Sequence, residues 1–116
     1  MPAHDFSLGE GDDQVVWSVP VFDSLGNQVD PHGGSVKLHY RIDDLSAAAI
    51  ETDGTIVTPV VGQPDWAAFT FLRAMTLGKA GVYIATWLVT LASTERISYP
   101  PIAADRYMTF EVKALP

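Results

Sequence analysis

The chain has 116 residues, of which 47% are hydrophobic and 18% are charged, and its formal net charge at pH 7 is −7. This length suits one domain, and this composition is typical of a chain with a buried core rather than of an intrinsically disordered one. The seven Lys and Arg residues are scattered singly, so we expect no nucleic-acid partner, and the absence of cysteine excludes disulfides, thiolate metal sites and cysteine nucleophiles.

The N-terminal residues carry no recognisable targeting segment. Met1 to Asp5 lacks the basic start of a secretory signal, and no apolar block follows it. Glycines and acids dominate the next residues, so we expect a tail and turn over residues 1–13 and a β-sandwich domain over residues 14–116. The longest uncharged run, Ala80–Thr94, is shorter than the roughly 20 apolar residues of a membrane helix. We therefore expect no membrane partner.

The first half of the domain alternates between apolar and polar residues. Gln14–Phe22 predicts a strand, and Pro20, which cannot donate a ladder hydrogen bond, places that strand at the edge of a sheet. Asp23–Asn27 contains the residues of a turn, and a loop is expected from Val29 to Gly34. The cleanest alternation lies in Ser35–Asp43 and predicts a half-buried strand.

The middle of the chain predicts a hairpin and two internal strands. The Asp53-Gly54 pair indicates a hairpin turn between Ile50-Glu51 and Ile56–Thr58, and residues 44–49 before it could form a short helical turn. Trp66–Leu72 carries apolar residues on both faces. Gly78–Leu91 does so as well, with Trp87 and its alternate neighbours on one face, and we expect it to be the central strand of the protein.

The remaining residues complete an all-β pattern. Ser93–Glu95 predicts a turn into Arg96–Tyr99, Pro100-Pro101 ends pairing there, and Tyr107–Lys113 predicts the last strand. Short strands separated by Gly, Pro, Asp and Asn turns, with no segment of helical period, indicate an all-β fold. The specific expectation is a single immunoglobulin-like antiparallel β-sandwich of about six to eight strands.

Residues that could support chemistry are few. The histidines His4, His32 and His39 do not have metal-ligand spacing, and the acidic clusters lack the alternation of a calcium loop and suit turn chemistry better. There is no Gly-x-Ser-x-Gly motif and no Gly-rich phosphate loop leading into a helix. We therefore expect no catalytic residue, no cofactor, no metal site and no enzymatic activity.

Aromatic residues offer the candidate contact positions. Trp17 and Trp87 are expected in the core, whereas Trp66 begins its strand directly after a loop and could lie at the rim. Because two strands are apolar on both faces, more apolar surface is available than one small core needs, and some of it should meet a partner or ligand. The candidate contacts are Trp66, Phe69, Phe71 and Tyr99.

The order of several short motifs resembles a known family. These motifs are Gly11-Asp12-Asp13, Val21–Asp30, Ala80-Gly81-Val82-Tyr83, Tyr99-Pro100 and Tyr107–Val112. Together they span almost the whole chain and resemble the small immunoglobulin-like domain of tailed-phage structural proteins, which also forms the N-terminal part of baseplate upper proteins. The resemblance implies a non-enzymatic virion part, a rigid spacer whose faces and termini dock onto neighbouring copies.

The resemblance and the aromatic residues therefore indicate two candidate functions. The first is a structural protein of a tailed-phage virion, joining baseplate or tail-fibre components or decorating the capsid. It would be made in the bacterial cytoplasm, act in the virion and contact other virion structural proteins in a homo-oligomer or a symmetric hetero-assembly. The alternative is a carbohydrate-binding or adhesion β-sandwich module that uses Trp66 and neighbouring tyrosines as a stacking platform.

Overall fold

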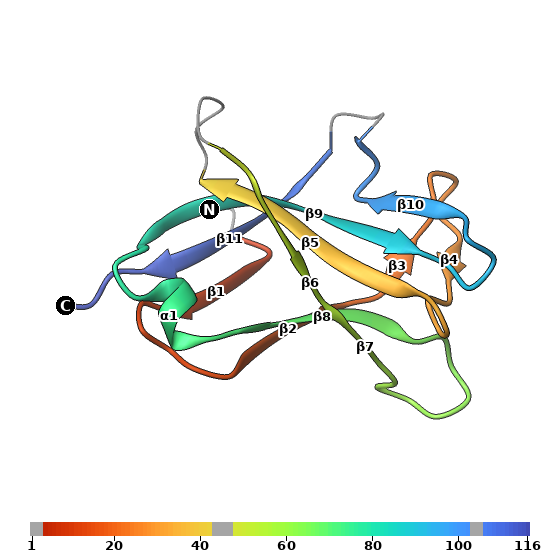
Figure 1. The fold of residues 1–116 in the computed structure, drawn as a ribbon, viewed down its shortest axis with the longest axis horizontal. Coiled ribbons are helices and arrows are strands. Elements are labelled where there is room, and N and C mark those ends of the chain that lie inside the picture. Colours follow the sequence, from red (N-terminus) through yellow and green to blue (C-terminus); the bar gives the residue numbers. More distant parts are fainter. Residues whose placement is uncertain (1–3, 43–47, 103–105) are drawn as a thin grey trace.

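Across the residues that the structure describes, the protein is all-β apart from one helical turn (Figure 1). The computed structural model describes residues 4–42, 48–102 and 106–116, which form eleven strands and the four-residue helix α1, Arg73–Thr76. Most of the segment for which a helical turn was considered, residues 44–49, lies outside the described residues. In the part of the chain that is described, no helix has the length and hydropathy to cross a membrane.

The larger sheet is built around strand β9. Its strand order is β1-β11-β9-β5-β6, and β10 pairs with the part of β9 that lies beyond β11. The pairing is antiparallel except between β1 and β11, which run parallel. The strands are β1 (Phe6–Gly9), β5 (Ser35–Ile42), β6 (Ile50–Asp53), β9 (Gly81–Thr90), β10 (Arg96–Tyr99) and β11 (Met108–Lys113). The prediction of a central strand at β9 is confirmed.

The smaller sheet has the order β2-β8-β7, and a two-stranded ribbon of β3 and β4 continues from one end of it. These strands are β2 (Val15–Val19), β3 (Val21–Phe22), β4 (Gln28–Val29), β7 (Thr55–Val57) and β8 (Trp66–Phe71). The edge position predicted for the first strand is confirmed, because β8 is the one strand that pairs with β2 in the described part of the chain, and Pro20 directly follows β2. The turn predicted after β3 is also confirmed, since Asp23 Oδ1 accepts hydrogen bonds from the backbone of Leu25 and Asn27.

One core joins the two sheets. On β9, Ala85, Trp87 and Val89 face inward and are buried, and the Trp87 ring lies 5.1 Å from the ring of Trp17 on β2. On β5 the alternation read from the sequence is confirmed, because Val36, Leu38 and Tyr40 are buried. Burial of these apolar side chains is the main favourable contribution to folding.

The hairpin predicted at Asp53-Gly54 is wrong. Strand β6 pairs with β5 in the larger sheet, whereas β7 pairs with β8 in the smaller one, so Gly54 carries the chain from one sheet to the other. Figure 1 shows β6 and β7 as one continuous path between the sheets. The Gly54 N–H donates a 2.8 Å hydrogen bond to the Val36 carbonyl, and a Cβ at Gly54 would lie 2.6 Å from the Ala68 carbonyl oxygen. Close backbone approach, rather than turn geometry, explains the glycine.

The tail predicted over residues 1–13 is wrong at Phe6–Gly9, which form strand β1. Leu8 is buried, and the Phe6 ring stacks on Trp17 with 5.4 Å between centroids. A four-residue strand with two apolar side chains gives too short an alternation to identify from sequence. Its parallel neighbour β11 lies at the other end of the chain, so no local pattern indicates the pairing. Likewise, Val29 belongs to β4 rather than to the loop expected there.

Candidate functional site

The outer faces of the two sheets differ in charge. The larger sheet presents charged side chains to solvent, among them Lys37, whose Nζ lies 3.5 Å from Glu51 Oε1, and His39, whose Nδ1 lies 3.7 Å from Glu51 Oε2. The smaller sheet turns Trp17, Phe69 and Phe71 toward the core, and the alternate positions, which face outward, carry no charge. Those outward positions are Val16, Ser18, Thr55, Val57, Trp66, Thr70 and also Ala68, although Ala68 itself is 0% exposed. We refer to them as the uncharged face.

A groove of about 270 Å³ opens at one end of the uncharged face. It brings together the chain after β2, the β3–β4 ribbon and the loop between β7 and β8. Its lining residues are Pro20, Phe22, Gln28, Pro59, Val60, Gln63, Pro64 and Trp66. None of these side chains is ionisable, and the amides of Gln28 and Gln63 are the main polar groups among them. The groove is therefore a neutral, mostly apolar surface with two hydrogen-bonding amides.

Two of the four candidate contacts lie around this groove. Trp66 is half-buried and lines it, and Tyr99 on β10 packs against Phe22, with 5.8 Å between the ring centroids. Phe22, which also lines the groove, thus connects the two predicted aromatics. The sequence does not mark Phe22 as a contact residue, because it directly follows the buried Val21 in a two-residue strand that is too short to show an alternation of its own.

The other two candidates, Phe69 and Phe71, lie in the core. They are 3% and 2% exposed, and their rings contact each other with 4.8 Å between centroids. Strand β8 is apolar on both faces, so the sequence alone did not indicate which alternate set points inward. The outward set on this strand is Trp66, Ala68 and Thr70.

Two exposed valines lie on the loop between β7 and β8, where Val60 lines the groove and Val61 follows it in the chain. Val60 is 58% exposed and Val61 is 93% exposed. Figure 1 places this loop and the β3–β4 ribbon at the end of the molecule opposite the C-terminus. This end therefore combines an apolar groove with apolar side chains that project into solvent.

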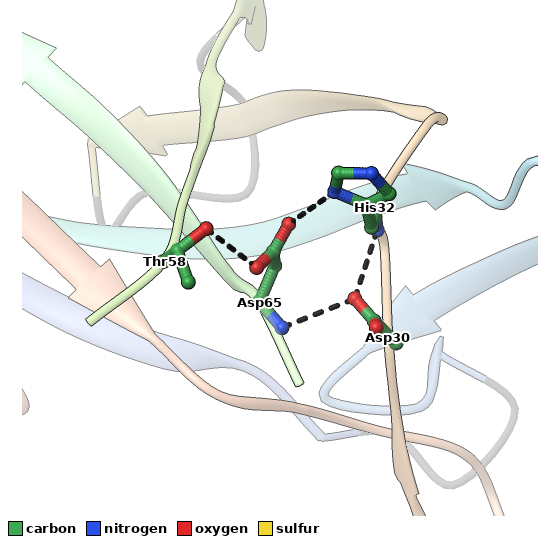
Figure 2. A network of polar contacts seen from close by, with 4 residues as sticks. All are labelled: Asp30, His32, Thr58 and Asp65. Carbon is green, nitrogen blue, oxygen red and sulfur yellow. Dashed lines mark hydrogen bonds and ion pairs between the residues drawn. The ribbon is translucent and has the colours of Figure 1, made fainter. Parts of the chain in front are cut away.

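A network of polar contacts fixes the loop that carries the valines (Figure 2). Asp65, at the end of this loop, is buried, and its carboxylate accepts a 2.7 Å hydrogen bond from the Thr58 hydroxyl and lies 2.9 Å from His32 Nδ1. Asp30 Oδ1 in turn accepts hydrogen bonds of 3.0 Å from the backbone N–H groups of His32 and Asp65. The network joins the β4–β5 loop to both ends of the β7–β8 loop, directly beside Trp66.

The same contacts shift the protonation of the two central groups. The hydrogen bond and the charge of Asp65 raise the pKa of His32, and the charge of Asp30 acts in the same direction. The hydrogen bond from Thr58, followed by the one from His32, lowers the pKa of Asp65. Each partner thus favours the charged form of the other.

The contacts among Asp30, His32, Thr58 and Asp65 suit the holding of a loop in one conformation better than acid–base catalysis. In a Ser-His-Asp triad the histidine lies between the carboxylate and the hydroxyl, so that it can take the hydroxyl proton. Here the carboxylate of Asp65 lies between Thr58 and His32. The Thr58 hydroxyl therefore donates to a carboxylate and is not paired with a histidine base that could activate it.

The acidic residues before β2 serve as backbone caps. Glu10 accepts hydrogen bonds from the N–H groups of Gly78 and Leu115, Asp12 accepts one from Gly9, and Asp13 accepts one from Arg73. Among the residues that the structure describes, no three His, Cys, Asp or Glu side chains are grouped closely enough to hold a metal ion.

The chain matches no protein-family model, no curated protein and no solved structure with which it was compared. The surface features that distinguish it are the uncharged face, the groove at the end of that face and the exposed valines beside the groove.

Proposed function

We propose that the two sheets form a variant of the immunoglobulin-like sandwich. The order β11-β9-β5-β6 facing β2-β8-β7 corresponds to strands G-F-C-C′ facing B-E-D in that fold. A second feature supports the assignment. The hydroxyl of Tyr83, near the start of β9, donates a 2.6 Å hydrogen bond to the Lys79 carbonyl, as in the tyrosine corner found at the same place in immunoglobulin-like domains.

On this fold we propose a non-enzymatic structural protein of a tailed-phage virion, which docks onto neighbouring subunits through the uncharged face and its groove. The observation that carries the proposal is the contrast between this surface and the charged outer face of the larger sheet. Charged residues are depleted and aromatic residues enriched at the centres of protein interfaces. The groove has this composition, and the order of motifs resembling phage structural domains supports the same class of protein.

The polar network makes the surface suitable for docking. A loop that is already ordered loses less conformational entropy on association. Asp65 and Thr58 hold the two ends of the loop that presents Val60 and Val61, and His32 ties this loop to the β4–β5 loop. The two exposed valines are therefore presented on a fixed support.

The experiment is a search for the chain in phage particles. Particles released by the host that carries this gene are purified on a density gradient, and their proteins are quantified by mass spectrometry. We expect the chain at a fixed copy number relative to a major virion protein, in a ratio that suits a symmetric assembly. A chain recovered only from the particle-free lysate would contradict the proposal.

A pair of lysine variants then tests the docking surface. Val61→Lys adds a charge beside the groove at a side chain that is 93% exposed, so the fold is retained while incorporation into particles falls at least about tenfold. Leu115→Lys is the matched control, because Leu115 is 62% exposed and lies near the C-terminus, away from the groove. Equal losses for both variants would show that docking does not use the groove end.

A carbohydrate-binding or adhesion module is the second candidate, and the pair of glutamines favours it. Gln28 and Gln63 line the same groove as Trp66, and an aromatic ring beside neutral amides can stack on a sugar and hydrogen-bond to its hydroxyl groups. The test is a glycan array of neutral sugars followed by calorimetry. Binding that is lost in Trp66→Ala and kept in Tyr107→Ala would support this function, whereas an array without a hit would contradict it.

A further inference from the structure

Asp65 is the one buried carboxylate among the described residues, and it lies at the end of the loop that lines the groove. Its residue surface is 6% exposed. A buried carboxylate is costly unless hydrogen bonds and an opposite charge compensate it. In the described part of the chain its side-chain partners are the Thr58 hydroxyl at 2.7 Å and His32 Nδ1 at 2.9 Å (Figure 2). Of these two partners, His32 alone changes its charge near neutral pH.

His32 supplies the only positive charge at this site among the residues that the structure describes. No Lys or Arg there forms an ion pair with Asp65. The other charged group that faces His32 is Asp30, whose carboxylate accepts the backbone N–H groups of His32 and Asp65. The β9–β10 connection lies against Gly33, and its charged residue, Glu95, forms no ion pair with His32. Loss of the His32 proton therefore leaves two neighbouring acids without a cation.

The two central groups differ in their access to solvent. The His32 side chain is 79% exposed, whereas the Asp65 side chain is 8% exposed. Protons therefore reach the imidazole without any rearrangement, while the charge that the imidazole compensates is buried. The directions of the pKa shifts agree with this geometry, because the contact raises the pKa of His32 and lowers that of Asp65.

Thr58 and Asp65 enclose a loop, residues 59–64, that forms one wall of the groove. Four of the eight lining residues belong to this loop, namely Pro59, Val60, Gln63 and Pro64. All of its residues except Pro64 are exposed, so few apolar contacts hold it in place. Its one internal backbone hydrogen bond runs from the Gln63 N–H to the Val60 carbonyl over 3.1 Å. The position of the loop therefore depends on the contacts at its two ends.

We propose that the protonation of His32 controls whether the groove is formed. While His32 is protonated, the loop over residues 59–64 is held closed and its wall of the groove is in place. Once His32 is neutral, the loop opens more often and this wall is lost. The direction follows from linkage: protonation stabilises the closed loop fully below the ordinary histidine pKa of 6.5, and this stabilisation is lost as pH rises through the raised pKa.

Hydrogen exchange of single amides in the purified chain tests the proposal. The reporters are the N–H of Gln63, which bonds to Val60 inside the loop, and the N–H of Asp65, which lies 3.0 Å from Asp30 Oδ1. Their protection factors, corrected for the intrinsic effect of pH on exchange, should fall about two- to fivefold between about pH 6 and 8.5, the range expected for a largely exposed ion pair. The fall should have the same midpoint as the titration of His32, followed by NMR on the same sample.

Two variants and one internal reporter serve as controls. His32→Gln keeps a neutral hydrogen-bonding side chain, so both protection factors should be low and constant over this pH range. His39→Gln should keep the wild-type pattern, because His39 lies beside Glu51 on the outer face of the larger sheet. The N–H of Leu25, which donates to the Asp23 carboxylate in another exposed turn, should show constant protection.

Three results would overturn the proposal. These are protection of Gln63 and Asp65 that does not change with pH, a fall that persists in His32→Gln, and an equal fall at Leu25 or at the amides of β9, which would indicate a general loss of stability. The assay measures the loop itself and needs no phage particle or sugar. Its outcome is therefore independent of the virion and carbohydrate-binding proposals.

Discussion

The hydroxyl of Tyr83 donates a 2.6 Å hydrogen bond to the carbonyl oxygen of Lys79, four residues earlier in the chain. This bond closes the connection between helix α1 and strand β9, where the chain leaves the smaller sheet and begins the central strand of the larger one. The Tyr83 ring also stacks on Phe110 of β11, with 4.9 Å between centroids and 6° between planes. The side chain therefore fixes the start of β9 from two directions.

Tyr83→Phe should destabilise the protein by about 1 kcal/mol, because it removes the hydroxyl and leaves the Lys79 carbonyl without this donor, while the ring remains on Phe110. Urea unfolding at neutral pH measures the change. Tyr107→Phe is the matched control, since Tyr107 is 56% exposed, and it should change the free energy of unfolding by less than about 0.5 kcal/mol. Equal effects for both variants would contradict a structural role for the bond.

Gly54→Ala should cost about 1–3 kcal/mol, the usual range for forcing extra atoms into a packed site. The new Cβ would lie 2.6 Å from the Ala68 carbonyl oxygen and 3.1 Å from Val36 Cγ1, so the crossing between the sheets would have to shift. Thermal or urea unfolding measures the loss. Thr55→Ala, at the exposed neighbouring position, should cost no more than about 0.5 kcal/mol. A loss at Gly54→Ala as small as this would contradict the close approach of the two backbones.

Gly54 also illustrates what local sequence patterns can and cannot predict here. Alternation predicted β5 and apolar faces predicted β9, because burial on one side of a strand imposes a period of two on the strand itself. The Asp53-Gly54 pair has the composition of a hairpin turn, but β6 and β7 pair with other strands rather than with each other. Which strands pair depends on the packing of the whole domain, and this is not encoded in the turn.

The candidate site was predictable to a similar extent. The position of Trp66 directly after a loop suggested the rim of a sheet, and Trp66 lines the groove. The contact between His32 and Asp65 joins residues 33 positions apart on two loops, and no spacing rule marks such a pair. Phe22 was missed for a similar reason, because it becomes part of the groove only when the β3–β4 ribbon folds beside the β7–β8 loop.

Trp87→Ala should cost about 3–5 kcal/mol, as expected for removing a fully buried tryptophan. Trp87→Phe should cost much less than that, for two reasons. Most of the ring contact with Trp17 is kept. In addition, Trp87 Nε1 is buried without a hydrogen-bond partner among the described residues, so the substitution removes a polar group that is costly to bury. Urea unfolding of the two variants measures the difference, and equal losses would contradict this account of the core.

The last prediction concerns pH and the pair formed by His32 and Asp65. Because the pKa of His32 is raised above its ordinary value of 6.5, the pair stabilises the fold fully below that value, and this stabilisation is lost as pH rises through the raised pKa. Because the pKa of Asp65 is lowered below 3.8, its contribution is present above that value and is lost as pH falls through the lowered pKa. The stabilising effect of the pair should therefore be greatest between about pH 4 and 6.5.

Thermal unfolding of the wild type and of His32→Gln, followed from about pH 4 to 9, tests this prediction. The difference in melting temperature between the two proteins should be largest near about pH 5 to 6 and should shrink above neutrality, where the wild-type histidine loses its proton. His39→Gln makes the same chemical change on the outer face of the larger sheet, away from Asp65, and should not reproduce this pattern. If the difference in melting temperature between the wild type and His32→Gln instead grows with pH, His32 is held in its neutral form. A charged pair of His32 and Asp65 would then be the wrong assignment.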